Sequence, residues 1–448
     1  MKFSTPMPGR RAVLTSFAAA TVVALVGCST QTGQSAAKGE IGGKITVWTW
    51  NAPGSGLKAA IPAFQKLHPG VEVDVQDVGN PAIWEKITTG MAAGGSGLAD
   101  ILNIGIDYMG NYSEKFPKQL VDLRDLGADK LATQFPAGAW KSGQGPKGQV
   151  FGVPYEVNAA GFFFRQDLFK EAGIDYSGLK TWDELLAAGT TLKEKTGASL
   201  FSMDKAGTVG DSAGLFELLM GLQGAFYFNA AGDITLNGPE AVQSLEIIKK
   251  ANDLGLVEDV PGSWENLLVT LRGERKVATT SSGGWLAGVI EEEAPDMAGK
   301  WSVSLPPAVK TGGLTGAVNG GTYLSIPSSS KNQATAYAFI DFALGTLEGQ
   351  KLVYDGGGMF PGFKPMLDSD GFVAPNAFFG GEKVNQIFID ELNQDTPAVN
   401  YTSDYARALK AYVDVQTRVV LKGADPKTEL DEAAKQVAQQ TGRKLATN

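Results

Sequence analysis

The opening of the chain's body, residues 44–78, constrains the fold most. Lys44 to Trp50 (KITVWTW) is β-branched and aromatic, which favours a strand, and Asn51 to Gly56 contains Pro and Gly and is expected to end it. Leu57 to Leu67 has apolar residues at helical spacing before a His-Pro-Gly stop. Val71 to Val78 alternates valine with polar residues, as a strand with one wet face does. Strand, helix and strand in this order predict parallel pairing and an α/β fold.

The same pattern continues, because a helix is expected over Ile83 to Ala93 and a short strand over Ala99 to Ile104. In open α/β sheets, ligands lie beyond the carboxyl ends of the strands. Candidate ligand contacts therefore follow the first and third strands: Trp50, Asn51, Asp107 and Tyr108.

The N-terminal segment has the composition of a secretory signal. Three basic residues precede an uncharged run, Ala12 to Val26, which is too short to cross about 30 Å of hydrocarbon comfortably. Residues 1–27 are expected to be removed. Cys28, the only cysteine, follows Leu25-Val26-Gly27 in a pattern that resembles a lipobox, so a lipid on Cys28 is expected to anchor the protein to the outer face of the cell membrane. Arg10-Arg11 leaves the Sec and twin-arginine export routes both open.

Residues 28–40 are small and polar and predict a flexible tether. Removing residues 1–27 takes away three basic residues and leaves 36 Lys and Arg against 48 Asp and Glu. Such an acidic balance argues against nucleic acid or anionic lipid as partner. We expect a monomer.

The sequence lacks the residues that most catalytic mechanisms require. His68 is the only histidine and belongs to a helix stop, so a Ser-His-Asp triad or a histidine-built zinc site has little support. No Gly-rich phosphate loop with a following Lys is present. We therefore expect no cofactor and no metal. A glycosidase needs only two carboxylates, however, and that mechanism stays open.

The middle of the chain carries a more specific pattern. Phe151 to Asn158 (FGVPYEVN) runs into Ala159 to Ile174, and Thr181 with Glu184 predicts a capping box. This run resembles the extracellular solute-binding proteins of ABC importers, of the sugar-binding type that includes maltose-binding proteins. Three further stretches extend the resemblance in order over most of the chain: Glu240 to Leu254, Leu271 to Trp285, and Asn319 to Ile326 with a helix from Ala334 to Leu344.

The resemblance implies a type II periplasmic-binding-protein-like fold, in which two hinge-linked α/β lobes enclose a ligand cleft. Carried onto this chain, lobe 1 comprises 41–157 and 323–358, and lobe 2 comprises 160–318 and 362–448. Gly356-Gly357-Gly358 and Pro361-Gly362 fit a third crossing between the lobes. Those glycines either free the backbone for hinge motion or mark a tight turn.

A sugar presents apolar C–H faces and a rim of hydroxyls, so its sites combine aromatic rings with acidic or amide side chains. By parity Trp48 and Trp50 share one strand face, and Trp50, which borders the loop, is preferred for the site. The family places an acidic sugar ligand at Asp107, a stacking ring at Trp285 and a late aromatic at Tyr405. The predicted ligand-binding residues are Trp50, Asn51, Asp107, Tyr155, Glu156, Asp211, Trp285, Asn319, Gly320, Gly321 and Tyr405.

The function that these features imply is capture of a carbohydrate, an oligosaccharide in particular, for delivery to an ABC transporter permease, with no enzymatic activity. Two alternatives stay open. One is a secreted carbohydrate-active enzyme that uses paired carboxylates. The other keeps the fold and binds a peptide, amino acid or polyamine; an amino-acid carboxylate needs an Arg, and Arg165, which starts a helix, is expected to lie outside the cleft.

Overall fold

The computed structural model describes residues 39–80, 82–207, 213–262, 264–394 and 399–447. The predicted signal segment, the lipidation site at Cys28, most of the tether and Asp211 lie outside these ranges. Within them, no helix combines the length and the apolar character that a membrane crossing needs.

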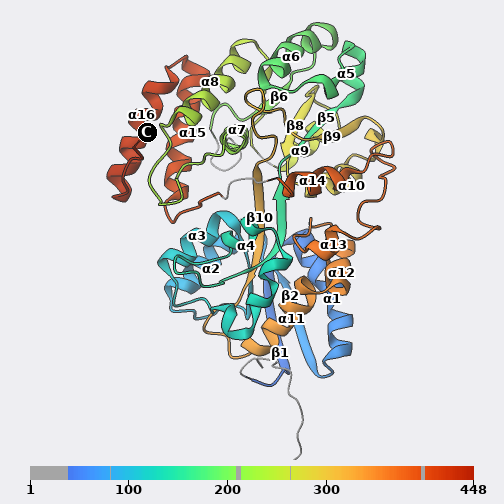
Figure 1. Ribbon diagram of the computed structural model, residues 1–448, viewed down its shortest axis with the longest axis vertical. Coiled ribbons are helices and arrows are strands. Elements are labelled where there is room, and N and C mark those ends of the chain that lie inside the picture. Colours follow the sequence, from blue (N-terminus) through green and yellow to red (C-terminus); the bar gives the residue numbers. More distant parts are fainter. Residues whose placement is uncertain (1–38, 81, 208–212, 263, 395–398, 448) are drawn as a thin grey trace, which may run out of the picture. The chain divides into compact units, whose positions relative to one another are not determined.

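Lobe 1 is the part of the chain built on a five-stranded sheet, whose strands have the order β2-β1-β3-β10-β4. β1 pairs in parallel with β2 and β3, which confirms the parallel arrangement predicted for residues 44–104. The fourth and fifth strands enter from much later in the chain: β10 lies antiparallel between β3 and β4 (Figure 1). The strands are β1 Gly43–Thr49, β2 Val71–Asp77, β3 Ile101–Gly105, β4 Val153–Ala159 and β10 Val318–Ser325.

Helices cover both faces of this sheet (Figure 1). Ile45 and Val47 of β1 belong to the apolar core that includes α1, α11 and α12, while Trp48 points to the opposite face and packs with α2 and α3. This alternation follows from the two-residue period of a strand. The helices are α1 Asn51–Leu67, α2 Ala82–Ala92, α3 Ile106–Lys115, α4 Ala137–Ser142, α11 Gln333–Gly345 and α12 Leu347–Gly357, with short 3-10 turns at Leu123–Leu126 and Ala128–Gln134.

The strand ends at Thr49, before residue 51, as predicted, but the first helix begins at Asn51 and not at Leu57, where the sequence predicted its start. Pro53 lies in the first turn, where backbone amides have no helical partner and the missing N–H costs nothing. Gly56 packs closely against α12, which comes from much later in the sequence. A Cβ at residue 56 would lie 2.7 Å from the Val353 carbonyl oxygen.

Lobe 2 contains two smaller sheets. Central β5 is antiparallel to β8 and β9, and β6 is parallel to β7. Its strands are β5 Gly161–Arg165, β6 Phe201–Met203, β7 Val257–Asp259, β8 Thr279–Ser282 and β9 Trp301–Ser304. Its helices are α5 Gln166–Ala172, α6 Trp182–Thr196, α7 Gly214–Gly221, α8 Pro239–Asp253, α9 Trp264–Leu271, α10 Trp285–Glu293, α14 Val384–Leu392, α15 Tyr405–Lys422 and α16 Pro426–Thr441, with 3-10 turns at Tyr176–Gly178 and Pro295–Met297. The short helix α13 Lys364–Leu367 packs beside α12 of lobe 1 (Figure 1). The capping box of Thr181 and Glu184 is confirmed at the start of α6.

The chain passes between the two sheet systems three times, between β4 and β5, just before β10, and between α12 and α14. We call these passages the crossings. Hydrogen bonds tie them together: the Ala160 amide donates to the Ala317 carbonyl at 2.9 Å, and the Val157 amide donates to the Phe360 carbonyl at 3.1 Å. The exact lobe boundaries stay a prediction.

The glycines before the third crossing serve helix packing. A Cβ on Gly356 would lie 2.5 Å from the Ala59 side chain, and one on Gly357 would lie 2.4 Å from the Ala52 carbonyl oxygen, so both allow α12 to approach α1 closely. Gly358 has φ +68° and ends α12 in the left-handed conformation. The sequence suggested hinge motion or a tight turn for these glycines. The structure adds a further role, the close packing of α12 on α1.

Candidate ligand-binding site

A group of half-buried aromatic rings lies beyond the carboxyl ends of β1 and β3. Trp50 caps α1, Tyr108 lies in the first turn of α3, and Trp84 of α2 stands between them. The Trp84 ring stacks on Tyr108 at 4.3 Å between ring centroids and meets Trp50 edge-on at 5.2 Å. Half-buried rings in this position have the apolar surface on which a sugar ring can stack.

Lobe 2 contributes a second aromatic group. The Tyr401 and Tyr405 rings lie 4.8 Å apart, Phe226 stacks on Tyr405 at 5.8 Å, and Tyr227 meets Tyr405 at 5.5 Å. Tyr401 also packs against the lobe 1 core that contains Trp48 and Tyr112. This tyrosine therefore links the aromatic groups of the two lobes.

Two carboxylates accompany these rings. Asp107 lies in the first turn of α3, and Glu217 projects from α7, where its Oε1 accepts a hydrogen bond from the Tyr405 hydroxyl at 2.8 Å. Burial raises the pKa of Asp107 to about 6, although the backbone amides of Asp107 and Tyr108 partly oppose this shift. Burial also raises the pKa of Glu217 to about 7, and the charge of Asp107 adds to that rise. The pKa of Glu217 therefore responds to the charge of Asp107, but less than it responds to burial.

A third carboxylate lies at the crossings. Burial raises the pKa of Glu156 to about 7, and a hydrogen bond with Asn158 partly opposes the rise. Opposite it, β10 contains a bulge after Val318, with φ of +91° at Gly320 and +141° at Gly321. A Cβ on Gly321 would lie 2.8 Å from the Glu156 carbonyl oxygen. These glycines therefore permit close approach of β10 to β4 and a backbone conformation that other residues rarely adopt.

Tyr155 and Asn51 were both predicted to contact the ligand, but Tyr155 is buried and the Asn51 backbone is engaged with Asp77. Tyr155 is 1% exposed, and its hydroxyl donates to the Pro53 carbonyl at 2.6 Å, so the ring joins β4 to α1. Asn51 is exposed, with φ +24°, and its amide donates to Asp77 Oδ2 at 3.0 Å. Asn319 is half-buried in the bulge of β10.

Trp285 begins α10 and is half-buried. Its ring lies 6.2 Å from that of Trp264, which is 50% exposed, at an interplanar angle of 26°. The preceding glycines fit against the crossings: a Cβ on Gly283 would lie 2.5 Å from the Asn158 side chain, and one on Gly284 would lie 2.7 Å from the Phe360 ring. Trp285 is thereby held beside the crossings, with Trp264 as a neighbour.

The sequence analysis missed Trp84, Glu217, Trp264 and Tyr401. One signal for Glu217 was available, because it is the only charged residue in α7 (GLFELLMG), and an isolated charge in an apolar helix has to find a polar partner. Tyr401 gave no such signal, since its neighbours come from distant parts of the chain.

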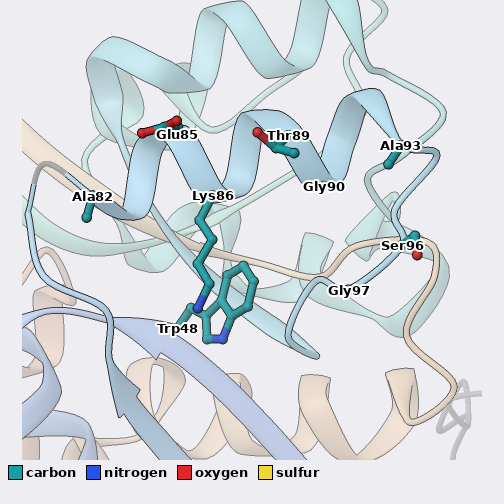
Figure 2. A pocket seen from close by; sticks show the side chains of 9 residues that line it. All are labelled: Trp48, Ala82, Glu85, Lys86, Thr89, Gly90, Ala93, Ser96 and Gly97. Atoms are coloured by element: carbon teal, nitrogen blue, oxygen red, sulfur yellow. The ribbon is translucent and has the colours of Figure 1, made fainter.

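A separate pocket of about 410 Å³ lies along α2 (Figure 2). Its lining includes Trp48, Glu85, Lys86 and Thr89, and none of the predicted site residues. The Lys86 ammonium lies 4.4 Å from the centre of the Trp48 ring, and the Trp48 indole donates to Gln76 Oε1 at 3.1 Å. This tryptophan is only 7% exposed, so the pocket has no free aromatic face for a sugar. Within the described ranges no cluster of His, Cys, Asp and Glu has the grouping of a metal site.

Comparison with known families gives the decisive observation. Residues 48–347 match the family described as bacterial extracellular solute-binding protein. The chain belongs to this family. Among the curated relatives of this solute-binding protein, the lactose-binding protein of Rhizobium radiobacter is 27% identical over 412 residues, which cover 90% of this chain and 93% of the relative. The arabinooligosaccharide-binding protein of Bacillus subtilis (strain 168) is 26% identical, with coverage of 93% and 96%.

Solved structures confirm the predicted two-lobed α/β fold of this solute-binding protein. The sugar-binding protein MalE from Xanthomonas citri superposes with a TM-score of 0.73 at 21% identity, covering 89% of this chain and 97% of that one. The ABC transporter associated binding protein from B. animalis subsp. lactis Bl-04, solved with beta-1,6-galactobiose, gives 0.72 at 23% identity, with coverage of 90% and 99%. At these identities the likeness speaks for the fold.

Proposed function

We propose that this solute-binding protein captures a carbohydrate, an oligosaccharide in particular, between its lobes and delivers it to the permease of an ABC transporter. One observation carries the proposal: half-buried aromatic rings and two carboxylates, Asp107 and Glu217, lie where the sheet of lobe 1 meets lobe 2. The names of the lactose- and arabinooligosaccharide-binding relatives support a sugar as the ligand.

The chemistry of these groups suits a neutral polyol. Rings such as Trp50 and Trp285 can stack on the C–H faces of sugar rings. Carboxylates accept hydrogen bonds from several hydroxyls at once, and those bonds replace the water that burial removes. Glu217 already accepts a hydrogen bond from the Tyr405 hydroxyl at 2.8 Å, so a sugar hydroxyl would share or replace that bond.

The proposed contact set keeps most of the sequence-based residues and adds four. Tyr155 is left out, because its ring and hydroxyl are already used between β4 and α1. The proposed contacts are Trp50, Asn51, Asp107, Glu156, Asp211, Trp285, Asn319, Gly320, Gly321 and Tyr405, together with Trp84, Tyr108, Glu217 and Tyr401.

The direct test is a thermal-shift screen with lactose, galactobiose, maltose and arabino-oligosaccharides. A sugar that binds only the folded state raises its stability by about 2.7 kcal/mol at 100 times Kd. We expect Asp107→Asn and Trp50→Ala to reduce that shift strongly, and the matched variant Lys86→Ala, at the separate pocket, to retain it. If no sugar raises the melting temperature, or if Lys86→Ala loses the shift as the site variants do, the proposal fails.

A second function keeps some support, because two interacting carboxylates with raised pKa values are also what a glycosidase needs. Incubation with labelled oligosaccharides separates the two. Recovery of intact, retained sugar supports a binding protein, and release of shorter products supports an enzyme.

We also propose that Cys28 carries a lipid that holds the protein on the extracellular face of the cell membrane. Its position after Leu25-Val26-Gly27 supports this. Cell fractionation tests it: Cys28→Ser is expected to move the protein out of the membrane fraction, and unchanged membrane association of the variant contradicts a lipid at this residue.

A further inference from the structure

One face of α3 makes a second, quite different connection between the lobes. Asp107, Gly110 and Glu114 are spaced three and four residues apart and therefore share that face. Asp107 belongs to the candidate ligand-binding site, while Gly110 and Glu114 meet the segment 401–403, which precedes α15. The proposed sugar site and this contact are thus successive turns of the same helix.

Gly110 allows the backbone of this segment to approach. A Cβ at residue 110 would lie 1.4 Å from the Tyr401 carbonyl oxygen and 2.6 Å from its carbonyl carbon. The first of these is the shortest such distance for any glycine of the described ranges. Because the obstacle is backbone, no rotation of a side chain can relieve it, and only glycine fits while α3 and Tyr401 stay in contact.

The remaining contacts are polar. Glu114 Oε2 accepts from the Ser403 amide at 3.3 Å and from Arg443 Nη2 at 3.0 Å, and the Lys115 ammonium donates to the Ser403 carbonyl at 3.3 Å. Arg443 is held in place by lobe 2 itself, since its Nε donates to Asp404 at 2.8 Å. Lobe 2 therefore holds Arg443 ready, and Glu114 of lobe 1 binds to it.

We propose that Gly110 and Glu114 of α3, with residues 401–403 and Arg443, form a clasp that holds the lobes closed over the bound ligand. The ligand part of this inference rests on the proposed function. The clasp combines the packing of the Tyr401 ring with one backbone contact and a few partly exposed polar bonds, so it is weaker than a buried core contact and can open and close again when a ligand draws the lobes together. Gly110 is a positioning residue here, since it touches Tyr401 and acts on the site through closure.

The test compares Gly110→Ala with the matched control Gly138→Ala, a glycine of α4 where an added Cβ would meet no neighbouring atom within 4 Å. With any sugar that binds the wild-type protein, Gly110→Ala is expected to lower affinity at least tenfold, chiefly through faster dissociation. The melting temperature of the sugar-free protein should change no more than in Gly138→Ala. Small-angle X-ray scattering should show a larger radius of gyration with sugar for Gly110→Ala than for the control.

Equal dissociation rates and equal radii of gyration for the two alanine variants overturn the clasp. Should Gly110→Ala fold poorly, Glu114→Gln gives an independent test: it is expected to speed sugar dissociation about threefold, and an unchanged rate overturns the proposal. Should no sugar bind the wild-type protein, the proposed function fails, and scattering of the sugar-free proteins still tests the clasp, because Gly110→Ala is expected to be more open than Gly138→Ala and equal radii overturn it.

Discussion

The lobes are joined in two places that differ in chemistry, the crossings and the clasp. At the crossings, Glu391 of α14 is 1% exposed, and its Oε1 accepts from the Ala160 amide at 2.9 Å and from the Ala317 amide at 2.7 Å. The apolar core is continuous there, with Phe360 and Phe388 rings 5.5 Å apart. At the clasp, the Arg443 and Glu114 side chains are 20% and 32% exposed, and Gly110 meets the Tyr401 backbone.

The difference in burial between the crossings and the clasp indicates which of the two can open. Buried hydrogen bonds and packed rings cost several kcal/mol to break, whereas a partly exposed ion pair contributes about 0–1 kcal/mol. The crossings are therefore expected to persist while the clasp opens, so that the lobes rotate about the crossings. Four predictions can break or sharpen this contrast.

The largest effect is expected at Glu391. Glu391→Ala removes the acceptor of the buried Ala317 amide, leaves the Ala160 amide with the Ala317 carbonyl alone, and creates a cavity, so the free energy of unfolding should fall by about 3–5 kcal/mol. Burial raises the pKa of Glu391 well above its usual range, although the two amides partly oppose this, and Glu391→Gln, which keeps an acceptor oxygen, should be far milder. Calorimetric unfolding checks both variants. Similar losses in the two would show that the amide bonds at the crossings contribute little.

The next effect is a dependence of stability on pH. The folded-state pKa values of Glu217 (about 7) and Asp107 (about 6) lie above the ordinary values, so the folded protein binds protons more tightly than the unfolded chain. Their contribution to stability is present at low pH and is lost as pH rises through about 6 to 7. Each group is half-buried, so Glu217 is expected to contribute at most about 2 kcal/mol.

Melting temperatures of the sugar-free protein between pH 5 and 8 check this, with Glu217→Gln as the comparison. The variant should lose less stability than the wild-type protein as pH rises. If both proteins lose stability equally over this range, Glu217 does not carry a raised pKa.

A third prediction separates binding from stability at Trp285. Because this ring is half-buried, Trp285→Ala should weaken sugar binding by tenfold or more, about 1.4 kcal/mol, while the sugar-free protein loses less than about 1 kcal/mol. Trp264→Ala, at the more exposed neighbouring ring, is the matched comparison and should have the smaller effect on affinity. A large loss of stability without loss of affinity would assign Trp285 to the core.

The smallest effect concerns salt. Screening weakens a partly exposed ion pair, so raising NaCl from about 0.05 to 0.5 M should speed sugar dissociation from the wild-type protein about twofold. Glu114→Gln, which cannot form the pair with Arg443, should show no such dependence. An identical salt response in both proteins would show that the ion pair between Glu114 and Arg443 does not slow sugar dissociation. The contact of Gly110 with Tyr401 would then be the part of the clasp left to test.

Local patterns predicted much of lobe 1. The parallel β1, β2 and β3 follow from alternation and helical spacing that any short window shows. The start of α1 was missed for two reasons. Pro53 is tolerated in a first helical turn, and Gly56 is needed where α12, from much later in the sequence, packs closely against α1. A short window contains neither fact.

The site was predictable only where a strand end or a family pattern marked it. Trp50, Asp107 and Trp285 were proposed in that way, and their part in binding stays a prediction. Glu217, Tyr401 and Gly110 matter through partners on distant segments, such as Tyr405 for Glu217 and the Tyr401 backbone for Gly110. Contacts between distant segments are set by the packing of the lobes, which no single stretch of sequence specifies.

The most direct test of the central claim is isothermal titration of the purified protein with lactose and arabino-oligosaccharides, followed by mass analysis of the recovered ligand. We predict saturable binding with Kd below about 10 µM, lost in Asp107→Asn, and recovery of the sugar intact. Absence of binding heat across these sugars, or recovery of cleaved products, would contradict the account.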